Sequence, residues 1–314
     1  MKLRKNVSMP SGGGSASGGK DIVVIYHRNC LDGFAGAWAA WKALGDRAEY
    51  IPATHQALPD VREFQRKEIY FVDFSYRKEV MDELVRTNRD VIVIDHHKTT
   101  ENVMPAVSPK SVLDSTHSGS VLAWHYFHSA DQVPEVLKYV EDQDLWKWKL
   151  PHTEEVATFL ATQGFEESRD FTSFDWFAAR FEDPEERSRA IAEGAVALRY
   201  KESIVRGIVR RADFISFEGR EMLSANTCIL SSEIGHALYS EHPPMSLTWY
   251  ERRDGVRVSL RSDGSVDVSD IAQKYGGGGH RAAAAFKVDL YKPLPWRYLE
   301  RPPAGFSGNI RGDI

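Results

Sequence analysis

The sequence predicts an α/β protein, in which a parallel sheet with helices on both faces is joined by a long helix to a smaller mixed α+β domain. Three observations lead to this fold class. Short β-branched runs alternate with helical patterns through the first half of the chain. A helical pattern then continues over residues 183–211 with few breaks. Beyond it, the spacing of apolar residues changes to two, which is typical of strands.

Three strands are expected in the first half, at residues 21–26, 68–75 and 90–97, where runs such as "DIVVIY" and "DVIVIDHH" are rich in valine and isoleucine. Helices are expected between them at 33–44 and 76–88, because apolar residues recur there every three or four positions. Strands that alternate with helices in this way form parallel sheets covered on both faces. Further helices are expected around residues 119–128, 134–141 and 154–162.

The connector helix is expected to begin at Asp183-Pro184, since Asp is a preferred N-cap residue and proline is favoured at the first helical position. A helix that continues to residue 211 would be a rod about 40 Å long. After it, Asp254-Gly255 and Asp263-Gly264 predict tight turns between alternating strands. Ser269 is expected to cap a short helix that ends at Tyr275.

These elements divide the chain into five segments. Residues 1–20 are rich in Gly and Ser and lack the apolar stretch of a signal peptide, so they predict a flexible lead, a tag remnant or a transit segment. The other segments are a first domain at 21–182, the connector helix at 183–211, a second domain at 212–290 and a tail at 291–314 that is expected to lie over the surface.

Composition limits the classes of function. Apolar residues make up 42% and charged residues 27% of the chain, which is typical of a globular protein. The net charge of −5 gives no overall attraction to long nucleic acids, so a phosphate-bearing substrate must be held locally. Two cysteines, Cys30 and Cys228, fit a reducing compartment, and we expect the cytoplasm. No apolar run reaches the ~18 residues that predict a transmembrane helix.

The predicted strands end in acids and histidines. In an open parallel sheet, ligands bind at the carboxyl ends of the strands, so these side chains are expected to meet at one edge. Acids that converge repel one another unless a cation lies among them, and a set of Asp and His without Cys suits Mn²⁺, Mg²⁺ or Fe²⁺ better than structural zinc. A single strand-end Asp can instead cap the next helix. The residues concerned are His27, Asp32, Asp73, Asp95, His96 and His97.

Two metal ions at such an edge make phosphoryl chemistry available. A pair of cations ~3.5–4 Å apart can deprotonate a bridging water, polarise a phosphoryl oxygen and stabilise the leaving oxygen. The helix that starts near Gly33 would also direct its N-terminal amides at the site, which favours an anion there.

A glycine run in the second domain predicts an anion-binding loop. "GGGGH", at residues 276–280, follows a short helix, and glycines allow a backbone to approach a ligand closely. His280 and Arg281 end the run, and Arg261 lies on a neighbouring predicted strand. A phosphate or carboxylate pocket is therefore expected, with a plain flexible turn as the alternative.

Five motifs resemble those of the DHH phosphoesterases that carry a C-terminal DHHA1 domain. They occur in order within residues 21–288 as "YHRNCLDGFAGAWAAW", "FVDFS", "VIDHH", "EDQDLWKW" and "VSLRS" with "GGGGHRAAAAF". The chain is most similar to the nanoRNase branch, whose members degrade very short RNA from the 3′ end or hydrolyse adenosine bisphosphate. RecJ nucleases, cyclic-dinucleotide phosphodiesterases and exopolyphosphatases are more distant members.

The resemblance implies a metal-binding catalytic DHH domain at 21–182 and a substrate-binding DHHA1 domain at 212–290. It implies that Asp95 holds the metal histidines in place and that His97 acts near the scissile phosphate, as an acid or an electrostatic stabiliser. The metal ligands that it implies are His27, Asp32, Asp73, His96 and Asp144. The substrate-binding residues that it implies are Arg261, Gly278, Gly279, His280, Arg281, Ser118 and Gly119.

One motif departs from the family pattern. Many members carry two alternating acids after the first histidine, whereas "HRNCLDG" offers only Asp32, with Asn29 as a neutral neighbour. An Asn carbonyl is a weaker ligand than a carboxylate, so one of the two metals is expected to bind loosely.

The function predicted from these patterns is a metal-dependent phosphodiesterase with two divalent ions, of which Mn²⁺ is the expected one and Mg²⁺ or Fe²⁺ the alternatives. Its substrates would be short single-stranded RNA or DNA oligonucleotides or small nucleotide phosphates, with Trp146 either stacking a base or packing between the domains. An exopolyphosphatase or other phosphomonoesterase is the first alternative, and a non-catalytic nucleotide-binding protein the second. Whether the chain forms a homodimer is left open, and no membrane partner is expected.

Overall fold

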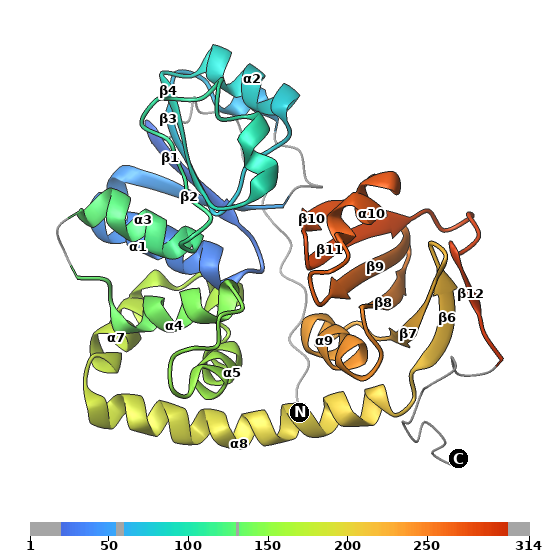
Figure 1. Ribbon diagram of the computed structural model, residues 1–314. Helices are drawn as coiled ribbons and strands as arrows, with labels where there is room; N and C mark the ends of the chain where they lie inside the picture. Colours follow the sequence, from blue (N-terminus) through green and yellow to red (C-terminus); the bar gives the residue numbers. More distant parts are fainter. Residues whose placement is uncertain (1–19, 55–59, 130–131, 301–314) are drawn as a thin grey trace, which may run out of the picture.

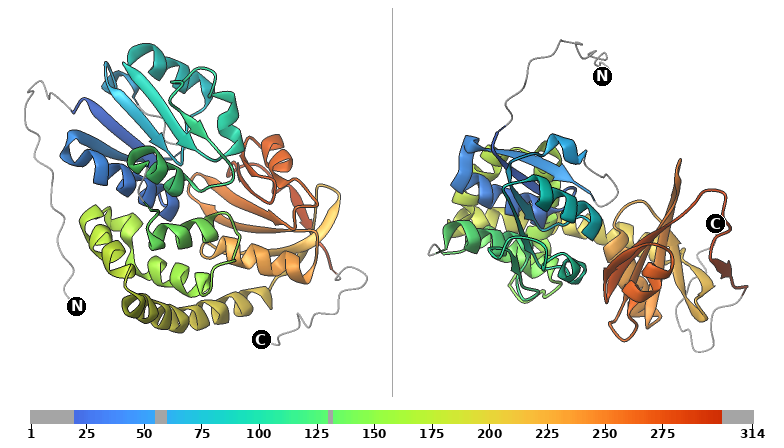
Figure 2. Two further views of the ribbon diagram at one scale, coloured as in Figure 1. Left: turned by 60° about the vertical axis from the view of Figure 1, so that its left-hand side comes forward. Right: turned by 90° about the horizontal axis from the view of Figure 1, so that it is seen from above.

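The computed structural model describes residues 20–54, 60–129 and 132–300, and the expectations for residues 1–19 and 301–314 lie outside these ranges. Two sheets with their own helices lie side by side, and a long helix runs beneath both (Figure 1). The view from above shows the same two parts next to each other (Figure 2). Within the described residues, no helix is long and apolar enough to cross a membrane.

The first sheet is parallel throughout, as predicted, with the strand order β2-β1-β3-β4-β5. The edge strands β2 and β5 were not predicted, because β2 contains a proline and is only partly buried, and β5 has two residues. The strands are β1 (Ile22–His27), β2 (Ala48–Ala53), β3 (Glu68–Val72), β4 (Asp90–Asp95) and β5 (Val112–Leu113).

Helices cover both faces of this sheet, which confirms the predicted fold class. Alternate residues of β1 point to opposite faces, so Val24 packs in the core that contains α1 and α3, whereas Val23 packs in the core that contains α2. Burying a side chain of this size completely stabilises the fold by about 1.5–3 kcal/mol. The helices are α1 (Leu31–Leu44), α2 (Lys78–Thr87) and α3 (Gly119–His128).

A layer of helices follows and carries the chain to the connector. The predicted segments around 134–141 and 154–162 are α4 and α5, and the aromatic α7 was not predicted. Phe174 of α7 is fully buried and packs edge-on against Phe34 and Trp38 of α1, which attaches this layer to the first core. The helices are α4 (Glu135–Asp144), α5 (Thr153–Gln163), α6 (Phe165–Ser168) and α7 (Phe171–Phe181).

The connector is a single helix, α8 (Pro184–Val209), and it begins as expected. The Asp183 carboxylate accepts hydrogen bonds from the backbone N–H groups of Glu185 and Glu186, and Pro184 occupies the first turn. Gly194 lies directly against α5, because a Cβ atom there would come within 2.0 Å of the Glu155 carbonyl oxygen. This contact fixes the first half of α8 on the first domain.

The second sheet is mixed, with the order β10-β11-β9-β8-β7-β6-β12 and a parallel pairing only between β7 and β8 among the pairs described. The hairpin at Asp254-Gly255 joins β8 to β9 as predicted. The elements are β6 (Asp213–Phe217), β7 (Arg220–Asn226), α9 (Ser231–Glu241), β8 (Met245–Arg252), β9 (Gly255–Ser262), α10 (Val268–Lys274), β10 (Gly278–His280), β11 (Ala283–Val288) and β12 (Trp296–Tyr298).

Two expectations for this part of the chain were wrong. Asp263-Gly264 does not join two strands: β9 ends at Ser262 and the chain passes into α10. The N-cap of α10 is Asp267, whose carboxylate accepts from the Ser269 N–H, so Ser269 is already inside the helix. Most of the described tail residues are exposed, and residues 296–298 add an edge strand to β6, with Trp296 7% exposed. The second domain that we propose therefore extends through β12.

Candidate metal centre and active site

The acids and histidines of the first sheet lie where the strands end. His27 is the last residue of β1, and Asp95 is the last of β4. Asp73 follows β3 directly and has a left-handed backbone with φ of 55°, so the chain turns sharply there. Asp32 lies in the first turn of α1 and is 2% exposed. His96 comes directly after Asp95. The carboxyl edge of the sheet thus brings together side chains that are far apart in sequence.

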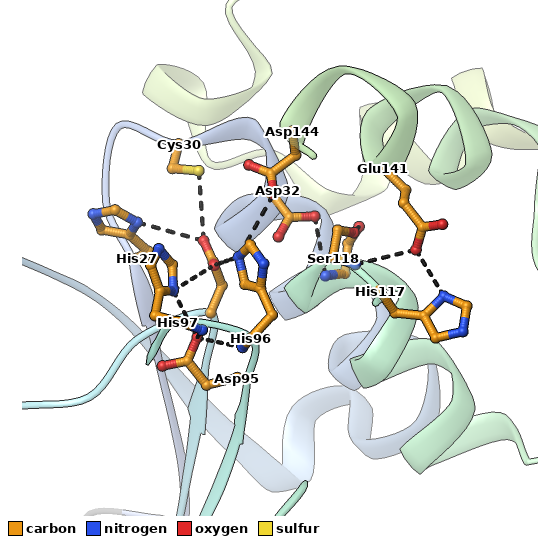
Figure 3. A network of polar contacts seen from close by, with 12 residues as sticks. His27, Cys30, Asp32, Asp95, His96, His97, His117, Ser118, Glu141 and Asp144 are labelled. Carbon is orange, nitrogen blue, oxygen red and sulfur yellow. Dashed lines mark hydrogen bonds and ion pairs between the residues drawn. The ribbon is translucent and has the colours of Figure 1, made fainter. Parts of the chain in front are cut away.

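Asp73 is at the centre of these contacts and is 1% exposed. Its Oδ1 lies 3.1 Å from His96 Nε2, and its Oδ2 lies 3.4 Å from His27 Nδ1. The Cys30 thiol donates a hydrogen bond of 3.5 Å to the same Oδ2. Asp144, at the end of α4, completes the cluster, with its Oδ2 3.5 Å from His96 Nε2 (Figure 3).

Three overlapping groups of side chains offer donor atoms that all lie within 4.8 Å of one another. Asp73 belongs to two of the groups and His96 to two, so the groups form one continuous centre. The members are His27, Cys30 and Asp73 in the first group, Asp32, His96 and Asp144 in the second, and Asp73, Asp95, His96 and His97 in the third.

This centre fits divalent cations. The buried Oδ2 of Asp32 has no hydrogen-bond partner in the described structure, although its Oδ1 accepts from the Ser120 N–H at 3.1 Å. An ionised carboxylate oxygen that is buried without a partner is costly, and a bound cation removes that cost. Asp32, Asp73 and Asp144 also converge from three separate elements, and oxygen-rich sets of this kind are the usual ligands of hard divalent ions.

The acids at the centre differ in their tendency to ionise. Burial alone would raise the pKa of Asp73, but hydrogen bonds with His27 and His96 outweigh it and hold this pKa well below its usual value. Burial raises the pKa of Asp32, and the negative charge of Asp73 raises it further. The pKa of Asp144 is also raised, by burial and then by the charges of Asp32 and Asp73. Of the three acids Asp32, Asp73 and Asp144, Asp73 is therefore the one that ionises most readily.

Asp95 lies beneath the two histidines and fixes both of them (Figure 3). It is fully buried, and its Oδ1 accepts from the His96 N–H at 2.7 Å and from His97 Nδ1 at 2.7 Å. Burial would lower the pKa of His97, but the hydrogen bond with Asp95 raises it to about 9. The His97 ring stacks on His280 of the second domain, with the ring centroids 4.7 Å apart.

Ser118 and Gly119 lie behind the centre and not on its open side. Ser118 is fully buried and its hydroxyl accepts from the Val121 N–H, which caps α3. Gly119 lies against Asp73, because a Cβ atom at Gly119 would be 2.5 Å from Asp73 Cβ and 2.9 Å from Asp32 Oδ2. The geometry gives these two residues a part in positioning the acids, and a contact with substrate stays a prediction.

The second domain supplies the opposite wall. Arg261 of β9 donates from Nη2 to the Ser232 hydroxyl at 2.7 Å and from Nη1 to the Leu260 carbonyl at 2.8 Å. Gly235 of α9 leaves room for it, since a Cβ atom there would be 2.7 Å from Arg261 Cγ. Arg261 and His280 both line the cavity between the domains.

The other predicted residues of the second domain lie outside the lining of that cavity. Gly278 and Gly279 form β10, which pairs with β11, and Gly279 has a φ of 144° that glycine adopts readily. Arg281 donates from Nε to the Gly264 carbonyl at 2.8 Å, and its Nη1 is 3.7 Å from an Asp267 carboxylate oxygen. Their contact with substrate stays a prediction.

The cavity between the two walls has a volume of about 540 Å³. Its lining combines metal-type ligands from the first domain with a cation and aromatic rings from the second. The residues include Cys30, Asp32, His96, Asp144, Trp146, Ser232, His236, Tyr239, Arg261 and His280.

Sequence reasoning missed some of these residues. A donor set without cysteine was expected, whereas the Cys30 sulfur belongs to the first group of potential ligands, and which of these side chains bind an ion stays a prediction. Asn29, which we expected beside Asp32, is exposed and belongs to none of the groups. The alternating spacing of Cys30 and Asp32 is a signal that could have identified the thiol. Ser232 and His236 carried no such signal, since they approach the site only through the arrangement of the domains.

The fold and the centre together define a class, namely enzymes that hold divalent cations at the carboxyl edge of a parallel sheet. The profile of the DHH family, N-terminal domain, matches residues 21–162, and the profile of the DHHA1 domain matches residues 225–294. The chain belongs to the DHH family and carries a DHHA1 domain, and it is a phosphoesterase of that metal-dependent family.

Individual relatives align with most of the chain. Protein R106 of Acanthamoeba polyphaga mimivirus is 29% identical over 303 residues, which cover 88% of this chain and 70% of R106. Oligoribonuclease NrnB of Bacillus subtilis is 24% identical over an alignment 335 positions long, which covers 91% of this chain and 82% of NrnB. Among solved structures, a pGpG-specific phosphodiesterase from Vibrio cholerae aligns at 13% identity with a TM-score of 0.46, covering 86% of this chain and 94% of that one.

Proposed function

We propose that the protein is a phosphodiesterase that hydrolyses short single-stranded oligonucleotides from the 3′ end, using two divalent ions of which Mn²⁺ is the preferred one. The observation that carries this proposal is the cavity of about 540 Å³ with potential metal ligands on one wall and Arg261 with His280 on the other. A phosphodiester on the centre would have its neighbouring nucleotide or terminal phosphate within reach of the second domain.

The proposed ligands of the ions are His27, Asp32, Asp73, His96 and Asp144. When bound, the ions would supply an activated water and polarise the phosphoryl oxygen. The protein's own groups then have separate tasks. Asp95 orients His97 and keeps it protonated, so that His97 can give a proton to the leaving oxygen. Arg261 holds the substrate through a phosphate oxygen, a role for which a guanidinium is well suited.

The size of the cavity supports short substrates. A volume of about 540 Å³ lies in the ordinary range for small-molecule sites, which is roughly 300–1,000 Å³. The chain has a net charge of −5, so its overall charge does not favour binding to a long phosphate backbone. Dinucleotides and other very short oligonucleotides fit both observations.

The position of Trp146 supports the proposal that the substrate carries a nucleobase. Its side chain is 42% exposed and lines the cavity, and its backbone has a φ of 54°, which is unfavourable for a bulky residue. The indole contacts Trp148 edge-on at 4.9 Å between centroids and approaches His236 of the second domain at 5.7 Å. An exposed aromatic ring kept in a strained conformation at a cavity is a suitable surface for stacking a nucleobase.

Replacing Trp146 by alanine is expected to raise KM for an RNA dinucleotide roughly 10-fold, since stacking contributes about 1–3 kcal/mol per base. KM for bis(p-nitrophenyl) phosphate or polyphosphate should rise less. Inorganic polyphosphate has no ring, and the phenyl ester has a smaller ring than a nucleobase. Steady-state kinetics on the three substrates measures the difference. Trp176→Ala is the matched control, since Trp176 is 63% exposed and stacks with Arg180 on α7. An equal loss on all substrates would contradict the stacking role.

Replacing Arg261 by alanine is expected to raise KM by about 10-fold to 100-fold while kcat changes little, because a charge-assisted hydrogen bond to phosphate contributes about 1.5–3 kcal/mol. Ser232→Ala should raise KM less, since Ser232 acts by positioning the guanidinium. Initial rates over a range of dinucleotide concentrations separate the two constants. A fall in kcat alone would place Arg261 in the chemical step instead.

The experiment that tests the proposed function is a substrate comparison. Purified full-length protein is incubated with a labelled RNA ladder of two to five nucleotides and with polyphosphate, in Mn²⁺ or in EDTA. We expect Mn²⁺-dependent shortening of the RNA. Phosphate release from polyphosphate alone would support an exopolyphosphatase, which needs the same metal centre but no base surface. Binding of nucleotide without any hydrolysis would support a regulatory protein.

A further inference from the structure

We propose that the Cys30 sulfur is a direct ligand of one of the two cations, and that it makes this position select for thiophilic ions such as Zn²⁺, Co²⁺ or Cd²⁺ over Mg²⁺. The inference rests on the metal centre described above and not on the phosphodiester reaction. It concerns the thiol that stands two residues before Asp32.

The distances in the first donor group agree with ligation. Cys30 Sγ is 3.5 Å from Asp73 Oδ2, and His27 Nδ1 is 3.4 Å from the same oxygen. A tetrahedral ion with bonds of ~2.3 Å to sulfur, ~2.1 Å to nitrogen and ~2.1 Å to oxygen separates sulfur from oxygen by about 3.6 Å and nitrogen from oxygen by about 3.4 Å. The two distances to Asp73 Oδ2 therefore agree with one such ion, and the sulfur and the His27 nitrogen lie within 4.8 Å of each other.

The backbone holds Cys30 in this position. Cys30 is the N-cap residue of α1, with φ of −135° and ψ of 126°, and its carbonyl accepts from the Phe34 N–H. The thiol does not cap the helix itself, so it is available to the centre. Since Asp32 follows two residues later in the first turn, the same turn of chain contributes both donors to the cavity.

A second observation points to a cation in the adjoining donor group of the same cavity. Asp32 is 2% exposed and its Oδ2 is buried without a hydrogen-bond partner. Asp32, Cys30 and Asp144 line the same cavity. A buried carboxylate oxygen without a partner is expected where a cation completes the site.

Ligation by Cys30 changes the chemistry of the centre. On binding, the thiol releases one proton to solvent and the sulfur donates an electron pair to the cation, so the position gains a negative charge and a soft donor. Thiolate is a preferred ligand of zinc and a poor one of Mg²⁺, which prefers oxygen. The group with Asp32, His96 and Asp144 has no sulfur and keeps the preference for harder ions.

Spectroscopy of the cobalt-substituted protein tests this inference without reference to activity. Full-length protein is stripped with a chelator and titrated with Co²⁺, and absorption is recorded in the near ultraviolet, where charge transfer from thiolate to cobalt absorbs and oxygen and nitrogen ligands do not. The variants are Cys30→Ser and Cys30→Asp. Cys228→Ser is the matched control, since Cys228 is exposed and belongs to none of the donor groups.

We expect the band in the wild type and in Cys228→Ser, and its loss in both Cys30 variants. Calorimetric titrations should show that Cys30→Asp shifts the ratio of Cd²⁺ to Mn²⁺ affinity at least 10-fold toward Mn²⁺, and circular dichroism checks that the variants are folded. The inference would be overturned if the wild type bound Co²⁺ without the band or bound no Co²⁺. It would also be overturned if Cys30→Ser kept the band. A band in a protein that hydrolyses no phosphodiester would leave the inference standing and reject the proposed function.

Discussion

Replacing Asp73 by alanine is expected to reduce kcat for dinucleotide hydrolysis by at least about 10³-fold, since each factor of ten corresponds to 1.36 kcal/mol and the ions contribute several kcal/mol. Asp73 is the residue that the His27 and Cys30 group shares with the group around His96 and His97. Its loss therefore removes a ligand from both sides of the centre at once. It also removes a negative charge from the centre, because the pKa of Asp73 is held well below its usual value.

Two measurements check this expectation. Single-turnover rates with Mn²⁺ give the loss in the chemical step, and the metal content after gel filtration shows whether both ions are lost. Asp82→Ala is the matched control, because Asp82 is an exposed acid of α2 whose Oδ1 lies 2.8 Å from Lys78 Nζ. If Asp73→Ala kept wild-type turnover, the proposed metal centre would be wrong.

Replacing His97 by alanine is expected to lower kcat by about 10²- to 10⁴-fold, with a much smaller change in KM, because proton transfer to the leaving oxygen acts in the transition state. The hydrogen bond with Asp95, 2.7 Å long, raises the pKa of His97 to about 9, so the ring carries its proton at neutral pH. His97 also stacks on His280, and some loss of contact between the domains is therefore expected.

A leaving-group series tests the role of His97 directly. Substrates with a good leaving group, such as a p-nitrophenyl ester of a nucleotide, need little protonation, so the variant should recover much of its rate on them. His125→Ala is the matched control, since His125 is exposed on α3. An equal loss on good and poor leaving groups would assign His97 to electrostatic stabilisation and not to proton donation.

The strand-end residues could be located from the sequence because a local pattern marks each of them. Asp95 directly ends a run of valine and isoleucine, and Asp73 follows "EIYFV". The parallel sheet then determines where they meet, since all its strands have their carboxyl ends at one edge. Asp144 has no such local signal, because it lies at the end of a helix and reaches the edge only through the packing of α4, and the family resemblance alone pointed to it.

Other parts of the structure depend on contacts that leave little trace in the sequence. The strands β6 and β7 have mixed burial patterns that do not alternate clearly. Pairing of β12 with β6 joins residues that are about eighty positions apart, in a segment rich in proline. The cavity depends on how α8 places one domain beside the other. The periodicity of α8 predicts its length but not the direction in which it leaves the first domain.

The helix α8 also determines how the second domain is rotated about the helix axis relative to the first domain. Gly194 holds it against α5, and the fifteen residues from there to Val209 span about 22 Å at ~1.5 Å per residue. Because each residue turns the helix by about 100°, one residue inserted in this span would rotate Arg261 and His280 far from the metal edge, although every side chain of both domains stayed the same. The number of residues between Gly194 and Val209 thus determines the orientation in which the second domain presents Arg261 and His280 to the metal edge.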